Sequence, residues 1–283
     1  MSDGFQLGIF YTIVRPEEKA ILAAAESRGI PVERYDDGAV TFGLDPPERL
    51  PDVVLNRSVS HTRSVYATRC FAHYGVPTVN APAVVELAGD KILSTLVLRE
   101  HGIPVPRTEI ALSPEAAMAA IERIGYPAVL KPAVGSWGRL MAKVDDAEEA
   151  EQILEHKAAL GSPIHSVFYV QEYVAKPDRD IRAFVIGDEL VAAMYRRSAA
   201  WRTNAARGAT AEPLALSAEL TELALRSAQA MGGGVLAVDL LESARGPLVL
   251  EVNPTPEFKT LTAATGADVA GRIVEYTVGI GHR

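Results

Sequence analysis

Apolar runs and helical patterns alternate through the first third of the chain, and this alternation restricts the fold more than any other feature. A short apolar run at 7–11 predicts a strand, and the helical pattern over 16–29 begins with proline and ends with glycine. Further strands are expected at 52–56 and 76–80, on either side of a helix at about 63–74. A helix between two strands returns the chain to the same end of the sheet, so the strands pair in parallel. The sequence predicts an open parallel α/β sheet here.

Beyond this region the pattern changes from α/β to α+β. Helical patterns lie at 90–102, 113–125, 145–160 and 217–231. Short β-rich apolar runs lie at 127–132, 140–144, 167–174, 181–187, 189–196, 235–242 and 247–253. The glycines at 232–234 follow a helix and are most simply a helix stop. The first unit therefore ends near Pro82, and the remainder is expected to be α+β with a mobile central lobe.

Composition excludes several classes of protein and partner. The 283 residues include 28 Lys+Arg and 36 Asp+Glu, a net charge of −8, which disfavours broad binding to nucleic acid or membranes because both are polyanionic. The single cysteine, Cys70, excludes an internal disulfide and a multi-cysteine zinc site. The sequence shows no signal-like segment and no apolar run of membrane-spanning length, so we expect a cytoplasmic protein.

Acidic and amide side chains occur inside two apolar runs near the C-terminus. Side chains alternate along a strand, so Glu251 and Asn253 share one face while Val252 faces the other, and Asp239 lies in a neighbouring run. Oxygen ligands of this kind suit Mg²⁺, with phosphate and water completing the coordination. The alternative is that both carboxylates are ordinary solvent-facing strand residues.

A lysine and a glycine-containing loop follow the strand at 127–132. Lys131, Gly135 and Gly138 place an ammonium and several backbone N–H groups where they can surround phosphates. The alternative is a hairpin whose glycines only turn the chain. The GxxxxGK[ST] phosphate loop is absent.

Basic residues concentrate between 191 and 211. Arg196, Arg197, Arg202 and Arg207 occur there without any acidic residue. Arginine is suited to bidentate binding of carboxylate or phosphate, which favours a polyanion site over the alternative of a solvated face. His61 lies in an expected turn and is interpreted as structural, since no partner for it is apparent in the sequence.

Taken in order, these motifs resemble the ATP-grasp superfamily over essentially the whole chain. The similarity is greatest to the carboxylate–amine ligase branch that contains the RimK-type and LysX ligases, in the segments NRSVSHTRSVYATR, GSWGRLMAKV, QEYVAKPDRDIR and EVN-x-T-x-EFK. It implies an ATP-grasp fold with an N-terminal pre-ATP-grasp α/β domain at 1–88. A small lobe with a phosphate-covering loop would follow at 89–171, and a large lobe with the metal and acceptor sites at 172–283.

The resemblance assigns roles to matching positions, with ATP and Mg²⁺ as cofactors and Mn²⁺ as an alternative metal. The implied nucleotide-binding residues are Lys91, Lys131, Gly135, Ser136, Trp137, Gly138, Arg139, Gln171, Glu172, Tyr173, Val174, Asp180, Arg202, Thr203 and Asn204. The implied metal ligands are Asp239, Glu251 and Asn253. The implied catalytic residues are Lys131, Arg196 and Arg207. The implied substrate-binding residues are Arg196, Asn204, Arg207, Thr255, Glu257, Phe258, Lys259 and Thr260.

The activity that the resemblance implies is ATP-dependent amide formation through an acyl phosphate. The C-terminal glutamate of a small acidic, LysW-like carrier protein would be joined to the α-amino group of α-aminoadipate, glutamate or a variant of these, in amino-acid biosynthesis such as that of lysine. A homodimer or homotetramer is expected. One alternative is RimK-like addition of glutamate to a protein C-terminus, and another is a non-catalytic module that binds nucleotide or carrier.

One segment departs from the family pattern. After Glu257-Phe258-Lys259 the α-aminoadipate ligases have Asn-Ser/Thr and the glutamate ligases Gly-Phe, whereas this chain has Thr260-Leu261. Pro254 replaces the usual histidine and Pro256 the usual methionine. Since this segment is expected at the amino-acid pocket, the departure predicts a related but altered amino acid.

Overall fold

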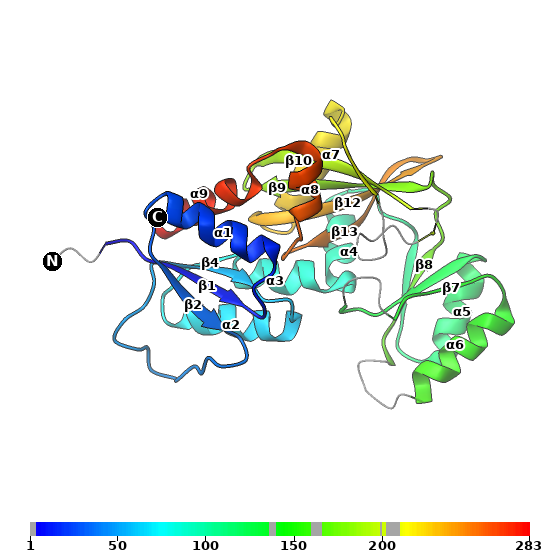
Figure 1. Ribbon diagram of the computed structural model, residues 1–283. Coiled ribbons are helices and arrows are strands. Elements are labelled where there is room, and N and C mark those ends of the chain that lie inside the picture. The colour runs from blue at the N-terminus through cyan, green and yellow to red at the C-terminus, as the bar shows by residue number, and fades with distance from the viewer. Residues whose placement is uncertain (1–3, 136–139, 160–165, 199, 202–209) are drawn as a thin grey trace.

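Three β-sheets organise the part of the chain that the structure describes (Figure 1). The computed structural model describes residues 4–135, 140–159, 166–198, 200–201 and 210–283. An N-terminal parallel sheet and a C-terminal antiparallel sheet lie together, and a smaller antiparallel sheet with its two helices forms a lobe to one side (Figure 1). No helix in the described ranges is both long enough and apolar enough to cross a membrane.

The N-terminal sheet is fully parallel, as the alternation of strands and helices predicts, with the strand order β2-β1-β3-β4. Its strands are β1 (Leu7–Tyr11), β2 (Val32–Asp36), β3 (Val53–Arg57) and β4 (Thr78–Val79). Its helices are α1 (Pro16–Ser27), α2 (His61–His73) and α3 (Pro82–Gly89). Strand β2 is absent from the sequence expectation because VERYD is largely polar and only partly buried. Helix α3 is also new, and it directly precedes α4 (Lys91–Glu100), which Asp90 caps through two backbone N–H groups.

The smaller lobe is an antiparallel sheet with the strand order β5-β8-β6-β7. Its strands are β5 (Thr108–Ala111), β6 (Ala128–Lys131), β7 (Ala142–Val144) and β8 (Phe168–Glu172). Helices α5 (Pro114–Ile124) and α6 (Ala147–Ala159) pack together beside it and share its hydrophobic core. Ser113 caps α5 and Gly125 follows its last residue, as expected. Because β6 and β7 form an antiparallel pair, Lys131 lies where the hairpin loop begins.

The C-terminal sheet has the order β11-β10-β9-β12-β13 and is antiparallel throughout. Its strands are β9 (Arg179–Ile186), β10 (Glu189–Arg197), β11 (Thr210–Pro213), β12 (Val235–Ser243) and β13 (Gly246–Asn253). Its helices are α7 (Ala218–Ala230), α8 (Lys259–Thr265) and α9 (Val269–Gly281). The stop expected at 232–234 is confirmed, since α7 ends before three glycines with positive φ.

One hydrophobic core joins the two ends of the chain. Helix α9 contacts α1 and β3, and its Ile273 and Val274 are buried with Leu7 and Leu55 of the parallel sheet and Phe184 of β9. The smaller lobe has its own core, built from α5, α6 and its strands. The N-terminal sheet and the C-terminal sheet therefore form one packed body, to which the smaller lobe is attached. The boundaries at 88 and 171 stay predictions.

Candidate active site

A cavity of about 460 Å³ lies where the three sheets meet. Its wall includes the segment from β3 into α2, the start of α4, the β6–β7 hairpin, the end of β8, and strands β12 and β13 with the residues after them. The sequence-predicted residues that line it are Lys91, Lys131, Gly135, Gln171, Glu172, Tyr173, Val174, Asp180, Arg196, Asp239, Glu251, Asn253, Thr255 and Glu257. Residues distant in sequence thus converge on one pocket.

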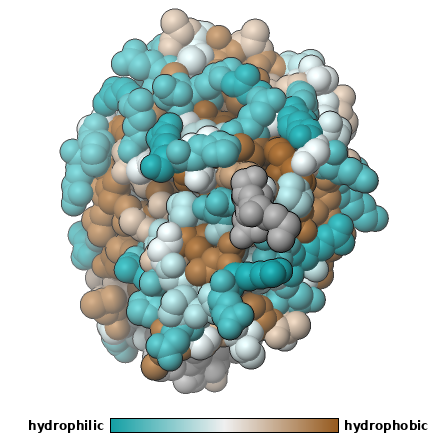
Figure 2. All heavy atoms as spheres, turned by 90° about the vertical axis from the view of Figure 1, so that its left-hand side faces the viewer, coloured by the Kyte–Doolittle hydropathy of each residue, from teal (hydrophilic) through white to brown (hydrophobic). Residues whose placement is uncertain are grey.

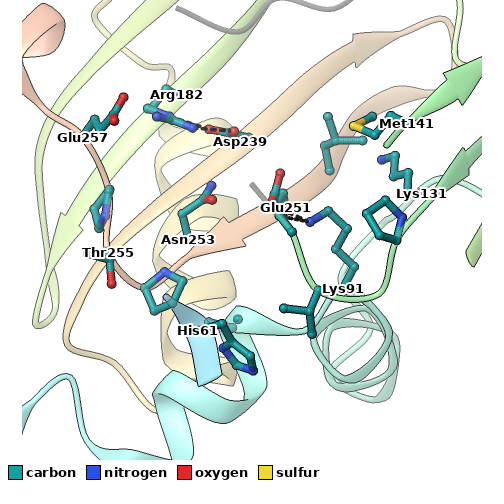
Figure 3. Close-up of a pocket in the computed structure, with 18 of the residues that line it drawn as sticks. His61, Lys91, Lys131, Met141, Arg182, Asp239, Glu251, Asn253, Thr255 and Glu257 are labelled. Atoms are coloured by element: carbon teal, nitrogen blue, oxygen red, sulfur yellow. Dashed lines mark hydrogen bonds and ion pairs between the residues drawn. The ribbon is translucent and has the colours of Figure 1, made fainter. Parts of the chain in front are cut away.

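The three oxygen-bearing side chains lie on one face of the β12–β13 pair. Asp239 is directly opposite Glu251, and Ala237 is opposite Asn253. Val252 is fully buried on the other face, so the expected alternation is confirmed. Asp239, Glu251 and Asn253 project into the pocket from the two strands (Figure 3). Asn253 Nδ2 is buried and has no hydrogen-bond partner among the described residues.

Two arginines hold Asp239. Arg182 donates to both of its carboxylate oxygens at 2.8 Å, and Arg196 lies 3.0 Å from Oδ2. Arg196 also binds Asp180 through Nε at 2.6 Å and Nη2 at 2.8 Å. Burial alone raises the pKa of Asp239, but both arginines outweigh it and hold that pKa below its usual range. Asp239 is therefore anionic, and Arg196 is tied into a buried network of two carboxylates.

Arg182 is absent from the residues expected at the site. Asp180 and Arg182 lie two positions apart on β9 and so share a face, and Arg182 is opposite Asp239 across the β9–β12 pair. The alternation along RDIR places both side chains together, whereas the pairing of β9 with β12 cannot be found from local sequence alone.

Two lysines lie at the other side of the pocket. Lys131 Nζ donates to Gln171 Oε1 at 2.6 Å, and burial lowers the pKa of Lys131 to about 8. Gln171 Nε2 in turn donates to the Tyr169 hydroxyl at 2.9 Å, which fixes the amide. Lys91 Nζ lies 3.2 Å from Glu251 Oε1 and donates to the Gly135 carbonyl at 2.7 Å. Both ammonium groups are close to the metal-ligand candidates, and Lys91 directly contacts one of them (Figure 3).

The segment after β8 has part of its backbone already engaged. The N–H groups of Glu172 and Tyr173 donate to the carbonyls of Arg107 and Pro127, at 2.9 and 3.2 Å. The Glu172 carboxylate accepts from the Arg107 N–H at 2.7 Å and pairs with Arg245. Burial alone raises the pKa of Glu172, but these contacts lower it. The Glu172 side chain thus has a structural role, and ligand contacts by this segment depend on its remaining backbone groups.

Not every expected residue reaches the pocket. Phe258 is buried against Phe184, with ring centroids 6.0 Å apart, and Lys259 and Thr260 begin helix α8 outside the cavity wall. The expected residues that lie outside the described part of the chain are Ser136, Trp137, Gly138, Arg139, Arg202, Thr203, Asn204 and Arg207.

Two further residues line the cavity although the sequence interpretation did not place them there. Arg15 comes from the loop before α1, and His61 begins α2. Burial lowers the pKa of His61, and a Cβ atom on Gly89 would lie 2.0 Å from the His61 ring, so the close approach requires glycine. Arg15 has no local sequence signal of function, whereas His61 lies in the segment NRSVSHTRSVYATR, in which the resemblance assigns it no role.

The donor set fits a divalent cation that also binds phosphate. Among the described residues no three His, Cys, Asp or Glu side chains are grouped closely enough to hold a metal by themselves. Two carboxylates and one amide oxygen on one strand face suit Mg²⁺ when phosphate oxygens and water complete the octahedron. In the structure Asp239 forms ion pairs with two arginines and Glu251 forms one with Lys91. A metal bound to these carboxylates would share them with the basic side chains.

Comparison with known proteins agrees with this geometry. The model of the RimK-like ATP-grasp domain matches residues 88–277, and the model of the LysX preATP-grasp domain matches residues 7–87. The chain belongs to the RimK-like ATP-grasp family. It is 36% identical to the alpha-aminoadipate–LysW ligase LysX of Sulfurisphaera tokodaii, over 95% of this chain and 96% of the relative. It is also 36% identical to the glutamate–LysW ligase ArgX of that organism, over 93% of this chain and 95% of the relative.

Solved structures confirm the ATP-grasp fold. A RimK domain ATP-grasp protein from Sphaerobacter thermophilus superposes with a TM-score of 0.81 at 27% identity, over 97% of this chain and all of that chain. A D-alanine–D-alanine ligase from Bacillus anthracis superposes with a TM-score of 0.74 at 16% identity, over 99% of both chains, and at this identity it supports the fold alone. The expected ATP-grasp fold and family are confirmed.

Proposed function

We propose that this protein joins an amino acid to the C-terminal glutamate of a small acidic carrier protein, in a reaction that converts ATP to ADP and phosphate. The main observation in support is a single pocket that combines two lysines with an Asp239, Glu251 and Asn253 oxygen set. The sequence similarity extends over nearly the whole length of relatives named as LysW ligases. ATP is the proposed nucleotide, and Mg²⁺ or Mn²⁺ the metal.

Activation of the carboxylate comes first because a carboxylate does not react with amines at neutral pH. A carboxylate oxygen of the carrier attacks the γ-phosphorus of ATP, the bond from that phosphorus to the β–γ bridging oxygen breaks, and ADP leaves. Phosphoryl transfer depends on alignment and charge neutralisation. Lys91 and Lys131 would neutralise the phosphates, while Asp239, Glu251 and Asn253 would hold the metal, which supplies further charge neutralisation when bound.

Amide formation follows from the acyl phosphate. The neutral α-amine attacks the acyl carbon, the carbon–oxygen bond to phosphate breaks, and the amine nitrogen loses a proton to give the amide. Water would destroy the intermediate, so the pocket must exclude water while the amine enters. Arg196 is buried and held by Asp180 and Asp239, so we propose that it stabilises charge through a fixed position and does not move to the substrate.

The amino acid is proposed to be dicarboxylic, namely α-aminoadipate, glutamate or a close variant. The relatives named above act on the first two of these. Pro254 and Pro256, which depart from the family pattern, line the cavity, whereas Thr260 does not. These two prolines are therefore the departures from the family pattern that we propose to affect the choice of amino acid.

The test is mass spectrometry of the carrier after incubation with ATP, Mg²⁺ and a panel of amino acids. We expect ADP and a single added amino-acid residue on the carrier. We further propose that the protein acts in the cytoplasm as a homodimer or homotetramer. Absence of an adduct across the panel would overturn the proposal.

A second candidate function is glutamate addition to a protein C-terminus. It is supported by similarity to a probable alpha-L-glutamate ligase of Rhodopirellula baltica, 34% identical over 91% of this chain and 67% of the relative. Repeated glutamate additions in the same assay, with no requirement for the carrier, would favour it. The non-catalytic alternative requires that Asp239→Ala leaves cellular function intact.

A further inference from the structure

A buried ion-pair network lies at one end of the cavity. Its residues have no role in the function proposed above. Glu18 of α1 is fully buried and accepts from Arg15 through Nε at 3.0 Å and through Nη2 at 2.8 Å. Arg57, at the end of β3 and also fully buried, donates from Nε to the same carboxylate at 3.0 Å. Burial alone raises the pKa of Glu18, but the two arginines outweigh it and lower that pKa. Glu18 therefore remains charged and fixes the orientation of Arg15.

The network is attached to the segment in which the sequence departs from its family. Arg57 Nη2 donates to the Pro256 carbonyl at 3.2 Å, and its guanidinium lies 5.8 Å from the centre of the Phe258 ring. Glu17 accepts from the Lys259 backbone N–H at 3.0 Å. Strand β3 and helix α1 thus hold residues 256–259 in place beside Arg15.

One nitrogen of Arg15, a residue that lines the cavity, is not bound by Glu18. Glu18 takes Nε and Nη2, and Glu18 also accepts from the Arg15 backbone N–H at 3.0 Å. Among the described residues, Nη1 hydrogen-bonds only to Glu257 Oε1, at a long 3.4 Å. The Arg15 side chain is 11% exposed and lines the cavity, while that of Glu257 is 38% exposed. Nη1 is therefore a preoriented donor whose partner can yield to a ligand oxygen.

This donor lies away from the phosphate side of the cavity. Thr255 and Glu257 appear on one side of the pocket and Lys131 on the other, with Asp239, Asn253 and Glu251 between them (Figure 3). An amino acid whose amine faces the metal-ligand candidates would extend its side chain toward Arg15. A guanidinium held by a second carboxylate suits a carboxylate ligand, because its geometry is fixed before binding.

We propose that Arg15 binds the side-chain carboxylate of a dicarboxylic amino-acid substrate, and that Glu18 and Arg57 act as positioning residues. This assignment rests on the proposed ligase function and adds the residue that selects acidic over neutral amino acids. The competing explanation is that the network only joins the N-terminal sheet to residues 256–259.

The experiment compares each acidic amino acid with a neutral counterpart in which a methyl group replaces the side-chain carboxylate. The pairs are α-aminoadipate with norleucine and glutamate with norvaline. The kcat/KM for carrier ligation is measured for wild type, Arg15→Gln, Arg15→Lys and the control Arg28→Gln. Arg28 follows the same helix but pairs with Glu275 on the surface, away from the cavity. Thermal unfolding establishes that each variant is folded.

We expect wild type and Arg28→Gln to prefer the acidic member of a pair by at least about tenfold, the scale of a lost hydrogen bond to a charge. Arg15→Gln should reduce this preference to within about twofold while leaving the KM for ATP unchanged, and Arg15→Lys should retain part of it. A preference that survives in folded Arg15→Gln would overturn the proposal. If Arg15→Gln does not fold, the proposal is tested with Arg15→Lys and with wild type. Equal kcat/KM of wild type for the acidic and the neutral amino acid of a pair would overturn the proposal. No adduct with any amino acid would instead contradict the ligase function itself.

Discussion

Lys131 is the residue whose chemistry depends most on its surroundings. It is buried beside Gln171, and its pKa falls from 10.5 to about 8 because burial disfavours the ammonium. Bound phosphates would favour the ammonium again and raise this pKa. Near and above pH 8, Lys131 is therefore protonated to a smaller extent in the free protein than in the complex, so nucleotide binding is accompanied by proton uptake. The affinity for the nucleotide falls as the pH rises through this range.

Calorimetric titration with the Mg²⁺ complex of ATP, whose terminal phosphate is already deprotonated at the pH values used, in two buffers of different ionisation enthalpy measures that proton uptake. We expect uptake of a fraction of a proton at about pH 8.5 and almost none at about pH 6.5, where both forms are protonated. Lys131→Arg, which keeps the charge and does not titrate in this range, should bind without uptake. Equal uptake in this variant would assign the proton to another group.

Glu251 allows a test of the metal-ligand candidates with little cost to the fold. It is partly exposed and pairs with Lys91, so Glu251→Gln should change the free energy of unfolding by less than about 1 kcal/mol. ADP formation should fall by about 100-fold or more because the charge of one oxygen ligand is lost. Glu212→Gln removes a comparable surface ion pair with Arg197 and should retain turnover within about twofold. Wild-type turnover in Glu251→Gln would exclude the carboxylate from the reaction.

At the scale of residues, the sequence predicts which side chains of one strand share a face. It does not predict which side chains from different elements come into contact. Alternation along β13 places Glu251 and Asn253 on one face, and the structure confirms it. Arg15 and Arg182 escape prediction because their neighbours come from other elements. Phe258 lies within the motif EVN-x-T-x-EFK, on which its substrate-binding role was expected, yet it is part of the hydrophobic core.

At the scale of elements, the junction between β4 and β12 depends on one close approach. Asn80 donates to the carbonyls of Val235 and Pro254, at 2.9 and 2.7 Å, and accepts from the Val235 N–H at 2.6 Å. A Cβ atom on Gly234 would lie 2.1 Å from Asn80 Oδ1, and Gly234 has φ of +108°. These contacts fix the end of β13, where the site begins.

Replacing Gly234 should therefore cost more than replacing its neighbour. Gly234→Ala is expected to lower the free energy of unfolding by about 2–4 kcal/mol, from backbone strain and disturbed buried hydrogen bonds. Gly233→Ala, which has φ of +76° but open space around it, should cost about 1 kcal/mol. Urea unfolding of both variants measures the difference, and equal losses would mean that the Asn80 contact contributes nothing.

The sequence predicts elements with strong apolar patterns or caps, and most of these are confirmed. Besides β2 and α3, strands β5 and β11 and helices α8 and α9 are missing from the expectation. The short β11 is mostly exposed, and α8 is only seven residues long. Helix α9 is strongly apolar and packs against α1 and β3. Its partners are distant in sequence, so the local pattern alone does not reveal this packing.

At the scale of the whole molecule, one core joins the chain's two ends and a second core belongs to the smaller lobe. Near α9 and the start of β1, the surface mixes hydrophilic side chains with separate hydrophobic patches, as expected for a face in water (Figure 2). The smaller lobe meets the larger body through few connections, among them Lys91 N–H to the Ala133 carbonyl at 2.8 Å. The cavity lies between these two packed bodies, so a ligand bound there would contact both of them.

This arrangement predicts where a nucleotide changes local stability. With ADP and Mg²⁺ bound, amide hydrogen exchange should slow in 128–131 and 168–174, which line or adjoin the cavity, more than in β1 and β3 of the shared core. Exchange followed by mass spectrometry gives both regions in one experiment. Protection in β1 and β3 equal to that in the smaller lobe would contradict a ligand site between the bodies.

The central claim is that ATP activates a carboxylate of the carrier protein, and an isotope experiment tests it most directly. The carrier is prepared with oxygen-18 in both carboxylates of its C-terminal glutamate, so that an isopeptide-type bond is also detected, and is incubated with the protein, ATP, Mg²⁺ and the amino acid. The account predicts that each phosphate released with ADP contains one labelled oxygen, because the carboxylate oxygen stays with phosphorus when the amine displaces it. Release of unlabelled phosphate while the amide forms would contradict it.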